Sequence, residues 1–221
     1  MNELTSLANK YLTDKGTEFD GQHNFTSVYY ENLNHLKNES LNILEVGIFN
    51  GSSVKMWRDF FSNSTIYCCD IVPQFFQSLQ NEPRIVSFQT DQSNRKILKE
   101  TINNLSVKFD IIIDDGSHQI DHQQLTLGIL FPYLKPNGYY ILEDLHTSLN
   151  PNYTDSFGGY DSSTLNMFKI YEDTGKWNSK FILSDEIKYL NSHTKSVDVY
   201  EWKNNRNKEN MSITSIIRKY A

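Results

Sequence analysis

The sequence is poor in cysteine, with only two residues, Cys68 and Cys69, side by side in the run IYCCDI. Neighbouring residues of a strand point to opposite faces of a sheet, so a disulfide between these two is disfavoured. Two reduced, buried thiols are typical of a cytosolic protein rather than of a disulfide-stabilised secreted one. We therefore expect a cytoplasmic protein.

The sequence also lacks long apolar runs and an excess of positive charge. No segment approaches the ~20 apolar residues that a membrane-spanning helix needs. The N-terminal residues MNELTSLANKYL have neither the basic start nor the apolar core of a signal peptide. The formal net charge is −6, whereas nucleic-acid-binding proteins usually carry a basic surface. We therefore predict that neither a membrane nor a nucleic acid is a partner.

Apolar strands and amphipathic helices alternate over the middle of the chain. Strands are predicted at 42–48, 65–71, 85–91, 109–115 and 139–144, and helices at 52–61, 94–105, 119–134 and 165–177. This alternation favours an α/β fold with a parallel sheet covered on both faces. Two further strands, 196–202 and 211–217, flank a polar segment and predict a closing antiparallel hairpin.

Two helices are predicted before this core, over 4–12 and 26–36. At 221 residues and 38% hydrophobic content, the chain suits one substantial core. We therefore expect a single domain with four parts: a helical N-terminal extension and cap, a cofactor- and metal-binding core, a substrate loop with its helix, and closing strands. The respective ranges are 1–41, 42–146, 147–177 and 178–221.

The first predicted strand of the core ends in LEVGIFNGSS, a stretch with the glycines of a ligand-binding turn. Gly47 and Gly51 would let the backbone approach a ligand, and the helix start that follows favours a negative group. Ser52 or Ser53 is placed to cap that helix. Glu45, at the end of the strand, could accept a hydrogen bond from a ligand ammonium group.

Polar side chains also follow the next two strands. Asp70 is placed as an acid that holds ribose hydroxyls, and Asp91 and Gln92 end the third strand. Neighbouring parallel strands would bring these side chains to one crevice. The alternative is an α/β domain with ordinary capping acids at its strand ends.

The spacing Glu-x-Gly-x-x-x-Gly resembles the first motif of the class I S-adenosylmethionine-dependent methyltransferases. The resemblance runs from residue 42 through the final hairpin and implies a Rossmann-like, mostly parallel seven-stranded sheet. It implies that Glu45 and Gly47 contact the methionine part of S-adenosylmethionine. Asp70 would hold the ribose, and Asp91 and Gln92 would lie beside the adenine. The whole cofactor-binding set expected is Glu45, Gly47, Gly51, Ser52, Ser53, Asp70, Asp91, Gln92 and Asp114.

Ionisable groups are concentrated in DDGSHQIDH, residues 114–122, directly after an apolar strand. The neighbouring strand ends in Glu143 and Asp144, so these carboxylates should emerge beside Asp115 at one rim of the sheet. Like charges would repel there unless a cation neutralised them. An all-oxygen set without cysteine suits Mg²⁺ before Mn²⁺ and argues against structural zinc.

DDGSH, followed by LFPYLKPNGYYILEDLHTS, resembles the metal-dependent O-methyltransferases of macrolide deoxysugars, of the mycinamicin and tylosin type. Cephalosporin-hydroxylase-like proteins share much of this pattern. The resemblance implies that Asp115, Glu143 and Asp144 bind the metal, and that His118 and Asp115 are catalytic, with His118 as general base. It implies an enzyme that methylates a hydroxyl of a sugar or glycosylated small molecule. A homo-oligomer is compatible with this, although no interface is visible in the sequence.

Several residue roles stay open at this point. His146 follows the metal-binding strand directly and is the alternative base, while His118 could instead be a helix-start histidine bonded to the backbone. Asp114 is expected to face the cofactor rather than the metal, since successive strand residues diverge. Asp121 and His122 are expected on a helix surface.

Two loops are also candidates for the site. The segment 147–164 contains Tyr153, Phe157 and Tyr160, and is either a substrate lid or a disordered insertion. The loop DKGTEFDGQH could cap the cofactor, with Lys15 and His23 as candidate contacts.

Two other functions remain as alternatives. A catalytically inactive scaffold or sensor that binds S-adenosylmethionine would need neither a base nor a metal. A cephalosporin-hydroxylase-like oxidative role would need iron, and the sequence shows no obvious set of two histidines and one carboxylate for it.

Overall fold

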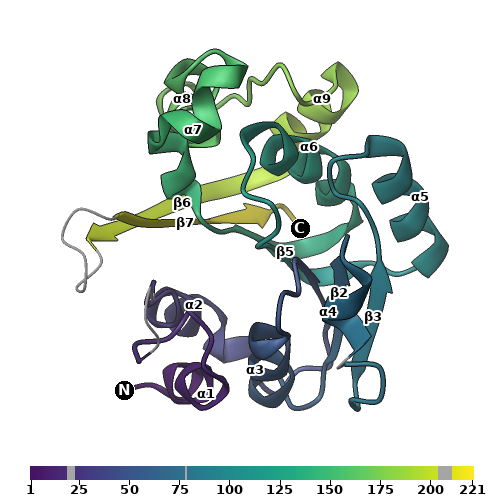
Figure 1. The fold of residues 1–221 in the computed structure, drawn as a ribbon. Helices are drawn as coiled ribbons and strands as arrows, with labels where there is room; N and C mark the ends of the chain where they lie inside the picture. Colours follow the sequence, from purple (N-terminus) through teal and green to yellow (C-terminus); the bar gives the residue numbers. More distant parts are fainter. Residues whose placement is uncertain (19–22, 78, 204–210) are drawn as a thin grey trace.

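A central sheet organises the structure, a computed structural model that describes residues 1–18, 23–77, 79–203 and 211–221. Its seven strands follow the order β3-β2-β1-β4-β5-β7-β6 (Figure 1). They are β1 (Asn42–Val46), β2 (Thr65–Asp70), β3 (Ile85–Gln89), β4 (Phe109–Asp114), β5 (Leu134–Leu142), β6 (Thr194–Lys203) and β7 (Met211–Lys219). Strands β1 to β5 pair in parallel, and β7 is antiparallel to both β5 and β6. The predicted α/β class and the antiparallel closing strands are confirmed. The segment expected to join β6 to β7 lies outside the described residues.

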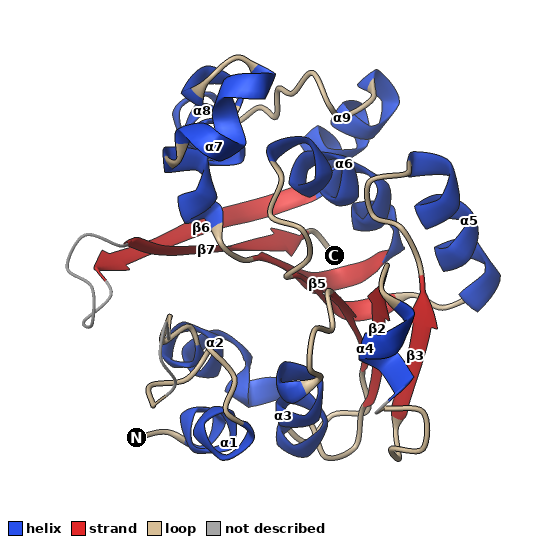
Figure 2. Ribbon diagram, viewed as in Figure 1, coloured by secondary structure: helices blue, strands red, loops and turns tan. Residues whose placement is uncertain are grey.

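Helices cover both faces of this sheet (Figures 1 and 2). They are α1 (Glu3–Tyr11), α2 (Thr26–Leu33), α3 (Ser52–Phe60), α4 (Pro73–Gln77), α5 (Arg95–Leu105), α6 (Ile120–Leu130), α7 (Pro151–Thr154), α8 (Thr164–Thr174) and α9 (Ser184–His193). The expected helical N-terminal start is confirmed by α1 and α2. Among the described helices, none is long and apolar enough to cross a membrane.

Two hydrophobic clusters lie on opposite sides of the sheet. One joins the strands to α1, α2 and α3, and the other joins them to α5, α6, α8 and α9. Cys68 belongs to the first cluster and Cys69 to the second, and both thiols are free. The adjacent cysteines therefore point to opposite faces as predicted. Their sulfur atoms point away from each other, which disfavours a disulfide between them.

Three local features were not anticipated. The segment 147–164 is not a disordered insertion, because it folds into α7 and short 3-10 turns, which include Asp155–Phe157 and Tyr160–Ser162. The range expected to contain the closing strands also contains α9, and α4 was not predicted. Among the helical residues of α9 only Leu190 is buried, so the helix shows little of the apolar periodicity from which a helix is predicted. The acids in its first turn, Asp185 and Glu186, were the better signal, since negative charge favours a helix N-terminus.

The start of α3 also differs from expectation. Neither Ser52 nor Ser53 caps this helix. Gly51 occupies the capping position with φ of +77°, and the N–H of Ser52 donates to Oδ1 of Asn50 at 3.0 Å. A left-handed backbone at this position favours glycine, so the tight turn, rather than a serine hydroxyl, begins the helix.

Candidate active site

A cavity of about 470 Å³ lies where β1, β2 and β4 end, a volume within the usual range of small-molecule sites. Eight predicted site residues line it: Gly47, Ser53, Asp70, Asp91, Gln92, Asp115, His118 and Asp144. Five others lie outside its lining: Glu45, Gly51, Ser52, Asp114 and Glu143. Residues predicted to bind the cofactor and residues predicted to bind the metal or to act in catalysis therefore line one cavity.

The cavity has further walls that sequence reasoning missed. Phe49 and Phe75 both line it, with ring centroids 5.6 Å apart and the rings nearly perpendicular. Thr13 and Asp14 reach it from the segment after α1, at the start of the loop expected to cap the cofactor. Tyr153, Phe157 and Tyr160, the aromatic residues of the expected lid, are absent from the lining.

Gly47 is required by a close approach of two backbone segments. Its φ is +94°, and a Cβ added there would lie 2.0 Å from the carbonyl oxygen of Asp115. No other residue type fits, since a side chain would overlap the turn that follows β4. The glycine thus serves the packing of β1 against β4 and also leaves open space at the cavity wall.

Asp70 ties the end of β2 to the turn after β1. Its Oδ2 accepts from the N–H groups of Ile48 at 2.9 Å and Phe49 at 3.3 Å, and its Oδ1 accepts from that of Val72 at 2.9 Å. An ionised carboxylate has about four acceptor positions. One therefore remains for a ligand hydroxyl in the cavity.

Gln92 and Asp114 hold the turn after β4. The side-chain amide of Gln92 donates to Oδ1 of Asp114 at 3.1 Å, and its Oε1 accepts from the N–H of Ser117 at 2.7 Å. Asp114 is buried behind the cavity, and burial raises its pKa to about 7. Asp114 is absent from the cavity lining and supports the cavity wall through Gln92.

Glu45 is a fully buried carboxyl group on β1. Within the described part of the chain, neither of its oxygens has a hydrogen-bond partner. Burial raises its pKa to about 7, against the opposing positive charge of Lys15. An unpaired carboxylate in this position destabilises the fold when it ionises.

We expect Glu45→Gln to stabilise the ligand-free protein above neutral pH. The folded-state pKa of about 7 exceeds the ordinary 4.5, so within this window the folded protein binds more protons than the unfolded chain. Stability therefore falls as pH rises through the window, and glutamine removes that loss. The gain at pH 8 should be on the order of 1–3 kcal/mol, measured by urea unfolding.

Glu39→Gln is the matched control for these unfolding measurements at different pH, because Glu39 is exposed. This control should leave the pH dependence of unfolding as it is in the wild type. An equally steep fall of stability between pH 5 and pH 7 in Glu45→Gln would show that Glu45 is not the group that titrates.

Backbone hydrogen bonds beyond the strands align the acidic residues of the rim. The N–H of Asp115 donates to the carbonyl of Val46 at 2.9 Å, and the N–H of Glu143 donates to that of Asp114 at 3.0 Å. Ligand atoms of Asp115, His118 and Asp144 lie within 4.8 Å of one another. Nε2 of His118 is 3.5 Å from Oδ2 of Asp144.

Two of these residues have a left-handed backbone. His118 has φ of +57° and Asp144 has φ of +56°. Residues other than glycine adopt this backbone conformation only at a cost in free energy, and residues in strained conformations cluster at functional sites. The hydroxyl of Thr147 donates to the carbonyl oxygens of both residues, at 3.2 Å for His118 and 2.9 Å for Asp144, and so supports both turns.

Lys15 is the site residue whose position the sequence least suggested. Its side chain is 1% exposed, and its Nζ lies 2.5 Å from Oδ2 of Asp115 and 2.7 Å from Oε2 of Glu143. Burial lowers the pKa of Lys15, but these two carboxylates outweigh it and raise the pKa well above its ordinary value. Lys15 was a candidate contact for the cofactor, and the structure shows it as a buried cation between two predicted metal ligands.

The acidic residues fit a hard divalent ion. In the described chain, Oε1 of Glu143 and Oδ1 of Asp144 are buried without a hydrogen-bond partner. Lys15 supplies one positive charge against the three carboxylates of Asp115, Glu143 and Asp144. Burial alone would raise the pKa of Asp144, but nearby histidines, His118 foremost, lower it. An additional cation would neutralise the remaining negative charge.

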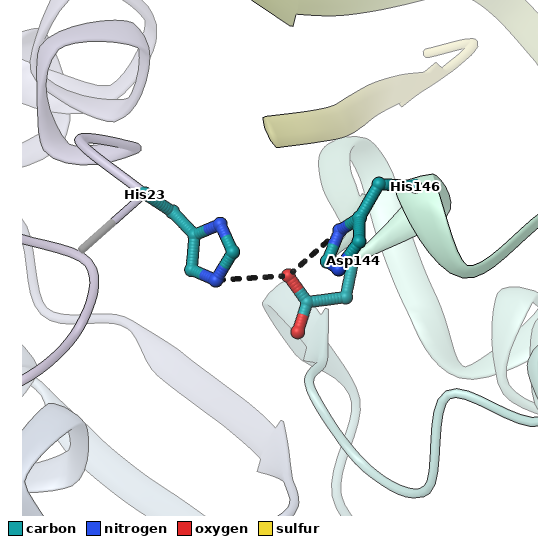
Figure 3. A group of neighbouring side chains, drawn as sticks. All are labelled: His23, Asp144 and His146. Atoms are coloured by element: carbon teal, nitrogen blue, oxygen red, sulfur yellow. Dashed lines mark ion pairs between the residues drawn. The ribbon is translucent and has the colours of Figure 1, made fainter. Parts of the chain in front are cut away.

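A second group of donors surrounds the same aspartate (Figure 3). Oδ1 of Asp144 lies 3.8 Å from Nε2 of His23 and 3.6 Å from Nδ1 of His146. The sequence shows no obvious set of two histidines and one carboxylate, but the fold brings one together. His23 lies far from His146 in the sequence, so spacing could not reveal the set. His146, the alternative base, is absent from the cavity lining, whereas His118 belongs to it.

Sequence comparison relates the chain to sugar O-methyltransferases. No family model matches the chain. It is 37% identical over 166 residues, 72% of its length, to the demethylmacrocin O-methyltransferase of Streptomyces fradiae. It is 34% identical over 164 residues, 71% of its length, to the mycinamicin VI 2''-O-methyltransferase of Micromonospora griseorubida. Each alignment covers 38% of the relative, so the chain spans about two fifths of the length of these proteins.

Solved structures agree with this relationship. The MycE methyltransferase of the mycinamycin biosynthetic pathway, in complex with Mg and SAH, superposes with a TM-score of 0.76 at 26% identity. The match covers 99% of this chain and 55% of that one. An O-methyltransferase from Bacillus cereus matches with a TM-score of 0.60 at 10% identity, which shows the fold alone. The chain therefore has the class I methyltransferase fold and is similar in sequence to O-methyltransferases such as those named for demethylmacrocin and mycinamicin VI.

Proposed function

We propose that this chain transfers the methyl group of S-adenosylmethionine to a hydroxyl of a sugar or glycosylated small molecule, with Mg²⁺ or Mn²⁺ as the metal. One observation carries the proposal: a single cavity is lined by the strand-end residues Gly47 and Asp70 and also by Asp115, His118 and Asp144. The names of the relatives support it, among them an 8-demethyl-8-alpha-L-rhamnosyl tetracenomycin-C 2'-O-methyltransferase, as do the Mg and SAH bound to MycE.

The cofactor would occupy the part of the cavity beside β1, β2 and β3. Asp70 retains an acceptor position for a ribose hydroxyl, and Asp91 and Gln92 would flank the adenine. Gly47 and Ser53 would contact the methionine part. Glu45, Gly51, Ser52 and Asp114 would act indirectly, by shaping the two turns that form the wall. S-Adenosylmethionine, when bound, supplies an electrophilic methyl group.

The acceptor hydroxyl would lie beside His118. Asp115 and Asp144, with Glu143 behind them, would hold the ion, whose positive charge favours ionisation of a nearby hydroxyl. His118 would receive the proton on Nε2, the nitrogen that faces Asp144, and Asp144 would stabilise the imidazolium. Orientation of the acceptor by the cavity walls can contribute several kcal/mol, up to ~7–11 in favourable cases.

Chelation should inhibit this reaction. We expect EDTA to lower methyl transfer at least tenfold and added Mg²⁺ to restore it. Without the metal ion, the acceptor hydroxyl beside the carboxylates would lose the positive charge that favours its ionisation. The measurement is transfer of labelled methyl from S-adenosylmethionine to a panel of glycosylated acceptors with free hydroxyls. Cofactor binding, measured by calorimetry, is the control and should persist in EDTA. Full turnover in EDTA would exclude the metal from the mechanism.

A second candidate function rests on Lys15. Because its ammonium group already pairs with Asp115 and Glu143, the carboxylates could be arranged for a lysine in place of a metal. The chain would then be a cofactor-binding protein without transferase activity. Cofactor binding together with no methylated product across the acceptor panel, with or without Mg²⁺, would favour this alternative.

A further inference from the structure

Asp144 presents its two carboxylate oxygens to different partners. Oδ2 faces His118 at 3.5 Å, on the cavity side already described. Oδ1 faces His23 at 3.8 Å and His146 at 3.6 Å (Figure 3). The proposed methyl transfer makes no use of His23 or His146, so this second group of donors needs its own explanation.

Neighbouring side chains orient His23 toward the aspartate. Nδ1 of His23 lies 2.9 Å from the hydroxyl oxygen of Ser212 on β7, which leaves Nε2 to face Asp144. The ring stacks on Phe25 with centroids 4.9 Å apart and planes 10° from parallel. Histidines that bind metals are typically held in this way, with the second ring nitrogen hydrogen-bonded to a neighbouring group.

The other two donors are left without partners. Within the described residues, Nδ1 of His146 and Oδ1 of Asp144 are buried and make no hydrogen bond. Buried polar atoms in this state are costly. The separations of 3.6 and 3.8 Å are too long for hydrogen bonds but approach the ~3.3 Å between neighbouring donors around a tetrahedral ion such as Zn²⁺. Small side-chain movements would bring all three donors onto one ion.

We propose that His23, Asp144 and His146 bind a second divalent cation, a first-row transition ion such as Zn²⁺ or Co²⁺, with at least one position open to water. Two imidazoles and one carboxylate prefer such ions over Mg²⁺, which prefers oxygen donors. Asp144 would then contribute one oxygen to each of two neighbouring metal sites. This inference goes beyond the proposed function and holds whether or not the chain transfers methyl groups.

The test is Co²⁺ binding to the intact chain in a buffer with excess Mg²⁺, which occupies oxygen-only sites. We expect a visible absorption band that saturates at one equivalent of Co²⁺ and is abolished by competing Zn²⁺. His23→Ala and His146→Ala should each weaken Co²⁺ binding at least a hundredfold. Ser212→Ala should weaken it by a smaller factor, about tenfold, because it removes the group that orients His23.

His193→Ala is the matched control, since His193 lies on α9, stacked on Tyr189. It should leave the Co²⁺ band unchanged, and circular dichroism verifies that each variant is folded. A wild-type chain without the band, or a band that survives in both His23→Ala and His146→Ala, would overturn the proposal.

Asp115→Asn separates this inference from the proposed function. That variant should lose Mg²⁺-dependent methyl transfer and keep the Co²⁺ band, because Asp115 is not a member of the second group. Absence of methyl transfer in a wild-type chain that shows the band would refute the transferase function alone.

Discussion

His118→Ala should lower the rate of methyl transfer by ~10²–10⁴-fold while S-adenosylmethionine still binds, because a positioned general base contributes that much. His118 lines the cavity and also faces Asp144. Its backbone has the left-handed conformation in this position. The measurement is the single-turnover rate with an acceptor found in the panel, together with calorimetry of cofactor binding.

His146→Ala and His35→Ala complete this experiment. His146 is the alternative base, so a larger loss in His146→Ala than in His118→Ala would move the assignment to His146. His35 is exposed, outside the cavity lining and beside Tyr139, and its alanine variant should retain the wild-type rate. Wild-type turnover in His118→Ala would remove His118 from the mechanism.

Lys15→Met should lower the free energy of unfolding of the metal-free protein by ~3–5 kcal/mol, the usual cost of leaving a buried carboxylate without its partner. The side chains of Lys15 and Glu143 are each only 1% exposed, so water cannot replace the lost ammonium group. Urea unfolding in EDTA measures the loss. Added Mg²⁺ should recover part of the loss, because an ion that binds only the folded state stabilises it by mass action.

Lys37→Met is the matched control for this substitution. Lys37 pairs with Glu3 at the surface, where such an ion pair contributes ~0–1 kcal/mol. If the unfolding midpoint of Lys15→Met were no lower than that of Lys37→Met, the contacts of Lys15 with Asp115 and Glu143 would not stabilise the fold.

The sheet could be predicted because its signals are local. Each parallel strand is a short apolar run with helix-forming residues beyond it, as in 109–115, where β4 is found at Phe109–Asp114. The carboxyl ends of such strands share one edge, so the order of strands and helices was enough to assign residues such as Asp70 and Asp115 to one cavity.

Weak local signals explain the missed helices. The helix α4 has five residues, too few to show a helical period. In 147–164 the turns are held by contacts outside the segment, for example the hydrogen bond from the N–H of Leu165 to the hydroxyl of Ser148. A Ser- and Asn-rich composition therefore suggested a loop where packing produces short helices.

By itself the sequence determined the α/β class, the succession of strands and helices, and which polar side chains end the strands. Only the tertiary structure decided that Lys15 pairs with Glu143, 128 positions away, and that Asp144 lies between His118 and two further histidines. The physical reason is that strands form from neighbouring residues, whereas these contacts depend on how the N-terminal segment packs across the finished sheet. Local periodicity contains no information about that packing.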